Sequence, residues 1–395
     1  MRTTRILHVV GSMNRGGVET WLMHVLRNID RQRFRMDFLV HTDRPAAYDA
    51  ELLALGARIL RCPYPHRPLS YGRRFLKTVK DCGPFDILHS HVHNFSGYVV
   101  WLGSVAGIPV RISHSHNDTR ILSAAATGPR SAYLSLSRRL LATFSTVCLA
   151  ASRPAASALF GSAWAQDPRV KIVYYGIDLS PFSSCVDRVA VRSEFGFHPE
   201  NIVFGHVGRF DTQKNHTFLI DIAAEIARRE AKARFLLVGD GPLRPSIEER
   251  ARRAGIADRT VFAGSRPDVA LLMLGAMDRL LFPSLYEGLG IVLTEAQAAG
   301  LPSIVSDVVP SEADVVPALI TRISLQQPAW MWAEEALRDR GCRVSDALSR
   351  VEKSPFNIAC SVEALTRVYC LQPPSPGSPA PVADLERETH LLGQG

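Results

Sequence analysis

The sequence predicts an α/β protein built from two domains, each containing a doubly wound parallel sheet. Its 395 residues exceed one ordinary hydrophobic core, since a domain typically has ~150 residues. Short β-rich runs alternate with helical segments in both halves, which is the pattern of parallel strands joined by crossover helices. A stretch of turn residues without periodicity, from Gly176 through Phe182 to about Cys185, separates the two halves.

In the first half, apolar runs rich in β-branched residues predict strands. They cover residues 6–10, 36–41, 57–61, 87–91, 110–114 and 146–150. Between them, apolar residues at helical spacing predict helices at 18–29, 48–55, 71–80, 96–106 and 131–144.

The second half repeats this rhythm. Predicted strands cover 202–207, 233–238, 260–263, 279–282 and 303–305, and predicted helices cover 216–229, 245–254, 268–277 and 291–299. Two such domains leave a cleft at the carboxyl ends of the strands, where α/β folds bind ligands. We therefore expect an N-terminal domain of residues 1–185 and a C-terminal domain of residues 186–372. Residues 373–395, which begin Pro-Pro-Ser-Pro-Gly-Ser-Pro-Ala-Pro, are expected to form a disordered tail.

Cysteine usage and hydropathy indicate a soluble chain in a reducing, cytosolic setting. The seven cysteines are scattered without a Cys-x-x-Cys pair, so neither a zinc ribbon nor a disulfide framework is predicted. The N-terminus runs directly into a strand-like segment and lacks the apolar core and cleavage site of a signal peptide. The most apolar run, residues 97–110, is shorter than the ~20 residues that span a bilayer.

The net charge of +8 is unevenly distributed. Residues 1–185 contain 23 Lys and Arg against 11 Asp and Glu, or +12, whereas the remainder carries −4. This asymmetry favours an anionic partner for the first half: a membrane surface, a phosphorylated acceptor or nucleic acid. A solvated basic surface without a partner is the alternative. No arginine-rich arm, aromatic stacking platform or zinc finger supports nucleic acid.

Two glutamates, Glu287 and Glu295, bracket a glycine-rich turn and the start of an apolar helix. Gly288 and Gly290 allow the backbone to approach a ligand closely. The free N–H groups of a helix that begins near Ile291 suit a phosphate. The two carboxylates would then bind neutral hydroxyls at the two ends of a nucleotide-sugar. The alternative is an acidic helix start favoured only by the helix dipole.

Cations and glycines follow other predicted strands. Arg209 offers a planar fork to a diphosphate, and Lys214 offers a mobile point charge. The first strand is followed by a glycine loop that contains Gly16 and Gly17, and residues 238–244 form another tight turn. Each feature alone also fits an ordinary surface turn. No Asp-x-Asp occurs, so we expect the diphosphate to be held without Mg²⁺ or Mn²⁺.

Two histidine clusters end predicted strands of the first half, at His89-Ser-His91-Val-His93 and His114-Ser-His116. Such clusters at strand ends can line one cleft, although single histidines are mostly structural. Zinc is possible in principle. Because no cysteine or carboxylate set accompanies the histidines at metal-ligand spacing, no metal site is predicted.

Together these motifs resemble the family 4 glycosyltransferases of the GT-B class, also described as glycosyltransferase group 1. The resemblance covers about residues 5–371. The segments His-Val-Val-Gly-Ser-Met-Asn-Arg-Gly-Gly-Val-Glu and Ser-His-Ser-His-Asn are similar to the group that makes bacterial capsule and exopolysaccharide. The resemblance implies a GT-B fold: two Rossmann-like domains facing across a cleft, the first on the acceptor side and the second binding the nucleotide-sugar.

The resemblance also implies an activity, that of a retaining, hexosyltransferase-type enzyme. The donor would be a nucleotide-sugar, with a UDP-sugar expected first. The acceptor would be a saccharide or a polyprenyl-diphosphate-linked saccharide. No cofactor or metal is implied.

Site roles can be carried over by position. Glu295 would hydrogen-bond the donor ribose, while Glu287 and the backbone of Gly288, Leu289 and Gly290 would contact the donor sugar. Arg209 and Lys214 would hold the diphosphate, and Gly16 and Gly17 would face it from the other domain. His114 would lie near the donor sugar, while His91 and His116 would line the acceptor side of the cleft. Residues 355–369 resemble the family's closing helix, expected to pack back on the first domain, with Asn357 where the family has Asp.

Basic helices with apolar stripes, at 71–80 and 131–144, can lie on anionic lipid. The resemblance implies an acceptor at the inner leaflet, so a cytoplasmic protein is expected, with peripheral binding to the inner face of the plasma membrane as the further hypothesis. Two ordinary surface helices are the alternative. Two other functions remain open: a GT-B-fold sugar-nucleotide epimerase, which would not usually present the paired glutamates, and a non-catalytic basic protein that docks on membranes.

Overall fold

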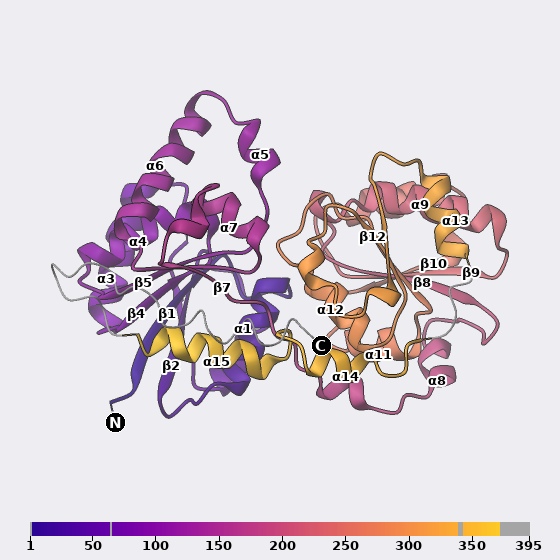
Figure 1. Cartoon of the computed structure of the whole chain (residues 1–395), viewed down its shortest axis with the longest axis horizontal. Helices are drawn as coiled ribbons and strands as arrows, with labels where there is room; N and C mark the ends of the chain where they lie inside the picture. The colour runs from indigo at the N-terminus through magenta and orange to yellow at the C-terminus, as the bar shows by residue number, and fades with distance from the viewer. Residues whose placement is uncertain (1, 64, 339–342, 372–395) are drawn as a thin grey trace.

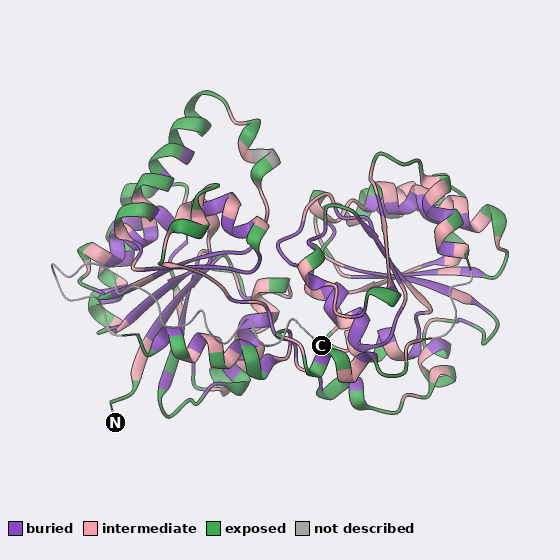
Figure 2. Cartoon of the chain, in the orientation of Figure 1, coloured by how far each residue is buried: buried purple, intermediate pink, exposed green. Residues whose placement is uncertain are grey.

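The computed structural model describes residues 2–63, 65–338 and 343–371 and contains two parallel β-sheets, each covered by helices on both faces (Figure 1). The strands of both sheets are largely buried, while the outer surfaces of the helices are exposed (Figure 2). The predicted α/β class, with two Rossmann-like domains, is confirmed. The predicted tail at 373–395 lies outside the described residues.

The first sheet has the strand order β3-β2-β1-β4-β5-β6-β7. Its strands are β1 (Thr4–Val10), β2 (Phe34–Val40), β3 (Ile59–Arg61), β4 (Ile87–Ser90), β5 (Val110–Ser115), β6 (Val147–Ala150) and β7 (Val170–Ile172). Its helices are α1 (Gly17–Asn28), α2 (Asp49–Ala54), α3 (Pro68–Cys82), α4 (Ser96–Val105), α5 (Arg120–Ala124), α6 (Gly128–Phe144) and α7 (Arg153–Phe160).

The second sheet has the order β10-β9-β8-β11-β12-β13. Its strands are β8 (Ile202–Val207), β9 (Ala233–Val238), β10 (Thr260–Gly264), β11 (Arg279–Phe282), β12 (Ser303–Ser306) and β13 (Ile320–Ile323). Its helices are α8 (Arg188–Ser193), α9 (His216–Arg229), α10 (Arg244–Arg253), α11 (Val269–Gly275), α12 (Ile291–Ala298), α13 (Ala329–Leu337) and α14 (Ala347–Glu352).

The last described helix, α15 (Ile358–Tyr369), returns to the first sheet and packs beside α1 (Figure 1). Trp21 of α1 donates its indole N–H to Ser361 Oγ of α15 at 2.8 Å. The two chain segments that cross between the sheets lie side by side, because the Ile177 N–H donates to the Phe356 carbonyl at 2.8 Å. The final helix therefore packs on the first sheet, although it follows the second sheet in the chain.

Two short strands were not predicted, β7 and β13, each at the edge of its sheet. Both have partly exposed residues, so they lack the continuous apolar run that identifies a central strand. Predicted helix 71–80 begins earlier, at Pro68, because proline is well tolerated in a first helical turn. The division of the chain at residue 185 stays a prediction.

Candidate active site

Loops from the two sheets are in direct contact, and the junction that they form is called the cleft below. The Ser152 hydroxyl donates a hydrogen bond to the carbonyl of Gly288. The Asp118 N–H donates to the Glu287 carbonyl at 3.4 Å. Because Asp118 and Ser152 follow strands β5 and β6, the carboxyl edge of the first sheet faces the loop after β11 in the second.

The loop between β11 and α12 requires glycine at two positions. Gly290 precedes α12 with φ of +85°, a left-handed conformation that side chains disfavour. A Cβ at Gly288 would lie 1.6 Å from the carbonyl oxygen of His116 across the cleft. Leu289 between them is buried and anchors the loop. The loop backbone is thus held directly against the first domain.

Glu287 and Lys214 form an ion pair inside this cleft. Lys214 Nζ lies 2.6 Å from Glu287 Oε1, and the two side chains are only 15% and 6% exposed. Gln213 donates from Nε2 to the other carboxylate oxygen at 3.3 Å and to the Tyr286 carbonyl at 3.0 Å. The sequence identified both charged residues but not Gln213. The carboxylate and the ammonium group therefore satisfy one another.

The backbone next to Arg209 packs against the turn that follows β9. A Cβ at Gly239 would lie 2.0 Å from the Gly208 carbonyl oxygen, so the two loops touch through backbone atoms. The Arg209 side chain is exposed and acts across the cleft on Glu19 of α1. Burial raises the pKa of Glu19 to about 7, while its own backbone N–H and then Arg209 oppose that rise. Glu19 was part of the predicted glycine loop, but no role was assigned to it.

Helices α1 and α12 begin opposite each other in the cleft. Gly16 caps α1 without a side-chain hydrogen bond. A Cβ at Gly17 would lie 3.7 Å from Ile291 Cγ2, the first residue of α12. Helix N-termini carry free N–H groups and partial positive charge, so their juxtaposition beside Arg209 and Lys214 suits a polyanion such as a diphosphate.

Glu295 lies in the second turn of α12 and is partly buried. Burial raises the pKa of its carboxyl group to about 7. A carboxyl group with a raised pKa readily changes protonation near neutral pH, and either form can accept hydrogen bonds from hydroxyls.

Replacing Glu295 with Gln should stabilise the free protein above pH 7. The folded state holds its proton more tightly than the unfolded chain, whose pKa is 4.5, so stability falls as pH rises from about 4.5 to 7 and then stays level. Removing the charge should recover up to roughly 3 kcal/mol at pH 8 and little at pH 4.5. Urea unfolding at both pH values measures this, with exposed Glu363→Gln as control. Equal stability of variant and parent at pH 8 would contradict it.

The three predicted histidines do not line the cleft equally. His114 is fully buried, with its ring edge-on to Trp21 at 5.3 Å between centroids, while His91 and His116 are hydrogen-bonded to each other at 2.9 Å. Only His116 reaches the donor loop, through its backbone carbonyl against Gly288. Two-residue spacing in a strand places side chains on one face, which explains why these rings gather under α1.

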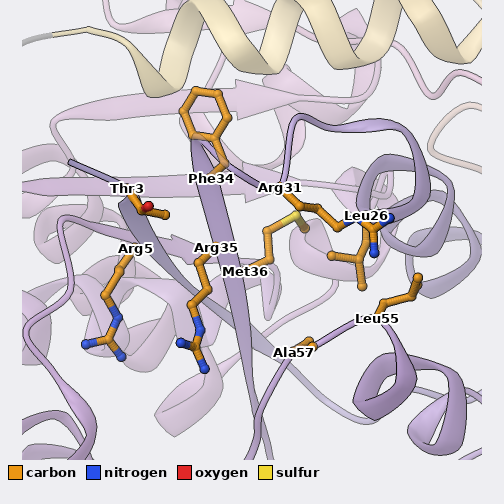
Figure 3. Close-up of a pocket in the computed structure, with 10 residues that line it drawn as sticks. Thr3, Arg5, Leu26, Arg31, Phe34, Arg35, Met36, Leu55 and Ala57 are labelled. Carbon is orange, nitrogen blue, oxygen red and sulfur yellow. The ribbon is translucent and has the colours of Figure 1, made fainter. Parts of the chain in front are cut away.

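A second hollow of about 480 Å³ lies away from the cleft, at the amino-terminal ends of β1 and β2 (Figure 3). Arg5 and Arg35 point the same way beside it. Both guanidinium groups lie within 4 Å of the buried Asp37 carboxylate, so this hollow is accompanied by a structural ion-pair cluster.

Both halves of the chain match models of known protein families. Residues 16–176 match the glycosyl transferase 4-like domain, and residues 187–339 match glycosyl transferases group 1. The putative glycosyltransferase EpsF of Bacillus subtilis is 37% identical over 340 residues, covering 85% of this chain and 87% of that protein. The Vi polysaccharide biosynthesis protein VipC/TviE of Salmonella typhi is 35% identical over 137 residues, 34% of this chain and 24% of that one.

Solved structures share the whole fold. The Anabaena Alr3699/HepE complex with UDP-glucose superposes with a TM-score of 0.75 at 18% identity, covering 92% of this chain and 98% of that one. Sucrose-phosphate synthase from Thermosynechococcus elongatus gives 0.75 at 18% identity, covering 93% and 98%. The chain is similar to EpsF along most of its length, and its two halves match the two family domains. It therefore belongs to the group 1 glycosyltransferases of the GT-B class.

Proposed function

We propose that this glycosyltransferase moves a hexosyl group from a UDP-sugar, with retention of anomeric configuration, to a saccharide or polyprenyl-diphosphate-linked saccharide in capsule or exopolysaccharide assembly. The observation that carries the proposal is the cleft itself: two helix N-termini and two cations converge beside a paired carboxylate. Support for the donor comes from the similarly folded HepE, which was solved with UDP-glucose. Support for polysaccharide assembly comes from the VipC/TviE relative.

The proposed mechanism stabilises the leaving group. Breaking the bond between the anomeric carbon and the diphosphate oxygen develops negative charge on the diphosphate, which Arg209, Lys214 and the N-termini of α1 and α12 would offset. No metal ion is required for this charge balance. The acceptor oxygen would form its new bond on the same face of the sugar, and its proton would pass to the departing phosphate oxygen.

The remaining contacts would place the donor. Glu295 would accept hydrogen bonds from the ribose, and Glu287 would bind sugar hydroxyls after Lys214 turns from it toward the diphosphate. Because the ring of His114 is fully buried, we assign the first-domain contact beside the sugar to His116, whose carbonyl meets Gly288. His114 would support this end of β5 from behind.

UDP and UDP-sugars should raise the thermal unfolding temperature, whereas GDP and dTDP-sugars should raise it less. A ligand at 100 times its dissociation constant adds about 2.7 kcal/mol to stability. The shift should survive EDTA and should be largely lost in Glu295→Ala. Scanning calorimetry with each nucleotide measures this. Absence of a saturable shift with every nucleotide would favour a non-catalytic docking protein, and a larger shift with GDP would reassign the donor base.

We further propose that the protein works in the cytoplasm at the inner face of the plasma membrane. No helix among the described residues is both long and apolar enough to cross a bilayer. Helices α3, α4 and α6 share one face of the first sheet, and exposed apolar side chains on them are Leu69, Val105, Tyr133 and Leu136. Residues 119–166 contain five arginines and no acidic residue. Basic and apolar groups together suit an anionic lipid surface.

Reversing two charges on α6, Arg138→Glu with Arg139→Glu, should weaken co-sedimentation with anionic vesicles at least tenfold, since each basic residue contributes about 1 kcal/mol at such a surface. Both side chains are exposed. The matched control, Arg252→Glu with Arg253→Glu, reverses two exposed arginines of α10 in the other domain. Binding that ignores lipid charge, or an equal loss in the control, would contradict the assigned face.

A further inference from the structure

Five histidines form a polar layer within the apolar face of the first sheet that α1 and α15 cover. They lie on three neighbouring strands or directly after them: His8, His89, His91, His114 and His116. All five side chains are buried, and each ring has at least one hydrogen bond to another histidine. Burying five imidazole rings in one core costs free energy unless their nitrogen atoms form hydrogen bonds or bind a metal ion.

Three of these rings converge. One ring nitrogen each from His91, His114 and His116 lies within 4.8 Å of one ring nitrogen of the other two. Their ring centroids are 4.3 to 5.6 Å apart. We propose that His91, His114 and His116 together bind one divalent transition-metal ion of the zinc class. Neutral imidazole is a preferred ligand for such ions, and three histidines are a sufficient protein set.

In each of the three rings, the nitrogen that faces away from the proposed ion is hydrogen-bonded to another side chain. The second nitrogen of His91 is 3.0 Å from His8 Nδ1, and that of His114 is 3.1 Å from His89 Nε2. His116 Nδ1 bonds the Tyr175 hydroxyl. Metal-binding histidines almost always use their other nitrogen in this way, because the second hydrogen bond sets the tautomer and the ring orientation.

The protonation pattern is also consistent. His91 would carry its proton on Nε2, His114 on Nδ1 and His116 on Nδ1, each donated to the partner behind it, which leaves the three facing nitrogens as lone-pair donors. The hydrogen bond between His91 and His116 places a proton on one of their facing nitrogens, so binding of the ion would shift that proton to the far nitrogen of the same ring without releasing it. Burial lowers the pKa of His116 to about 3 and holds the pKa values of His91 and His114 well below the usual range, so all three are neutral at pH 7.

A buried nitrogen atom without a hydrogen-bond partner also supports a metal ion between the three rings. Nε2 of His114 is buried and has no hydrogen-bond partner in the part of the chain that the structure describes. An orphaned buried polar atom costs about 1–3 kcal/mol, whereas a metal bond would satisfy it. The hydrogen-bonded pair of nitrogens on His91 and His116 supplies the other two donors.

The ion would not contact the donor diphosphate. It would join the carboxyl ends of β4 and β5 behind the segment at His116 that meets Gly288. A fourth position would remain for a water or small anion. The metal site and the proposed donor site share His116, whose ring would bind the ion while its backbone carbonyl meets Gly288, so metal content can be measured without sugar transfer.

Metal analysis tests this directly. Full-length protein is incubated with Zn²⁺ and desalted, and its zinc content is measured by inductively coupled plasma mass spectrometry. It should retain about one zinc ion per chain. His114→Gln and His116→Gln should each retain less than about a tenth of that. Two controls should bind as the parent does: His206→Gln, which changes a buried histidine of the second sheet, and His198→Ala, which changes an exposed one. Loss of zinc in His198→Ala alone would overturn the site.

A second measurement needs no variant. Co²⁺ bound to the unaltered protein should give the visible absorption bands of a four-coordinate site with three nitrogen ligands, and one equivalent of Zn²⁺ should displace it. A spectrum of six-coordinate cobalt, or no retained cobalt after desalting, would overturn the proposal even if the histidine variants fail to fold. The five histidines would then be a purely hydrogen-bonded layer.

Discussion

Replacing Lys214 with alanine should lower kcat/KM for sugar transfer by about a hundredfold to a thousandfold. The ammonium group is proposed to offset charge that grows on the leaving diphosphate, and loss of one such preorganised group typically costs roughly 3 kcal/mol of transition-state stabilisation. Arg209→Ala should have an effect of similar size, since it acts from the same loop. Steady-state transfer from a UDP-sugar, with product detected directly, measures both.

Lys214→Ala also removes the ion-pair partner of the buried Glu287 carboxylate. Glu287 is 5% exposed, and among the described residues its carboxylate would keep only the hydrogen bond from Gln213, so Lys214→Ala should lower the free energy of unfolding by about 3–5 kcal/mol. Stability and catalysis can be separated with the double variant Lys214→Ala/Glu287→Gln, which leaves no unpaired charge. It should regain most of the stability but none of the activity.

Two outcomes would contradict the role of Lys214. One is recovery of transfer activity together with stability in the double variant, which would make the ion pair purely structural. The other is a Lys214→Ala enzyme that is folded and within about threefold of the parent in kcat/KM. Lys214→Arg is the conservative control, and it should retain part of the activity because the charge remains.

The charged residues of the second-domain half of the cleft could be proposed from the sequence, because their signals are local. Glu287, the two glycines after it and Glu295 lie within nine consecutive residues at a strand-to-helix junction. A turn, a helix start and a carboxylate pair can all be read from such a stretch. Arg209 and Lys214 are equally local, since both follow β8 by a few residues.

What could not be predicted depends on contacts between distant residues. His8 stands alone in its strand, and only the parallel register that pairs it with His89 brings it to the other histidines. Gln213 matters only because its loop meets the one carrying Glu287. For Glu19, the pKa follows from burial in the folded cleft, which no spacing of residues reveals. The histidine spacing itself did carry a signal, since alternate positions in two strands share one face.

Replacing Gly288 with alanine should lower kcat by about a hundredfold or more while changing the affinity for UDP by less than tenfold. The new Cβ would lie 1.6 Å from the His116 carbonyl oxygen, whereas such atoms stay about 3 Å apart. The donor loop would therefore have to withdraw from the first domain. A misplacement of about 1 Å can cost a hundredfold in rate, because the reacting groups no longer meet in line. UDP contacts made by the second domain alone would persist.

A graded control comes from the other side of the same contact. Ser152→Ala removes the hydroxyl that donates to the Gly288 carbonyl without adding bulk, so it should cost only about 1 kcal/mol, or roughly fivefold in kcat. Transfer kinetics and calorimetric UDP titration of both variants decide the matter. If Gly288→Ala turns over at nearly the parental rate, the contact seen between the domains is not part of the catalytic conformation. If instead it loses UDP binding in proportion to kcat, Gly288 serves the donor directly, and domain contact would have to be tested through Ser152.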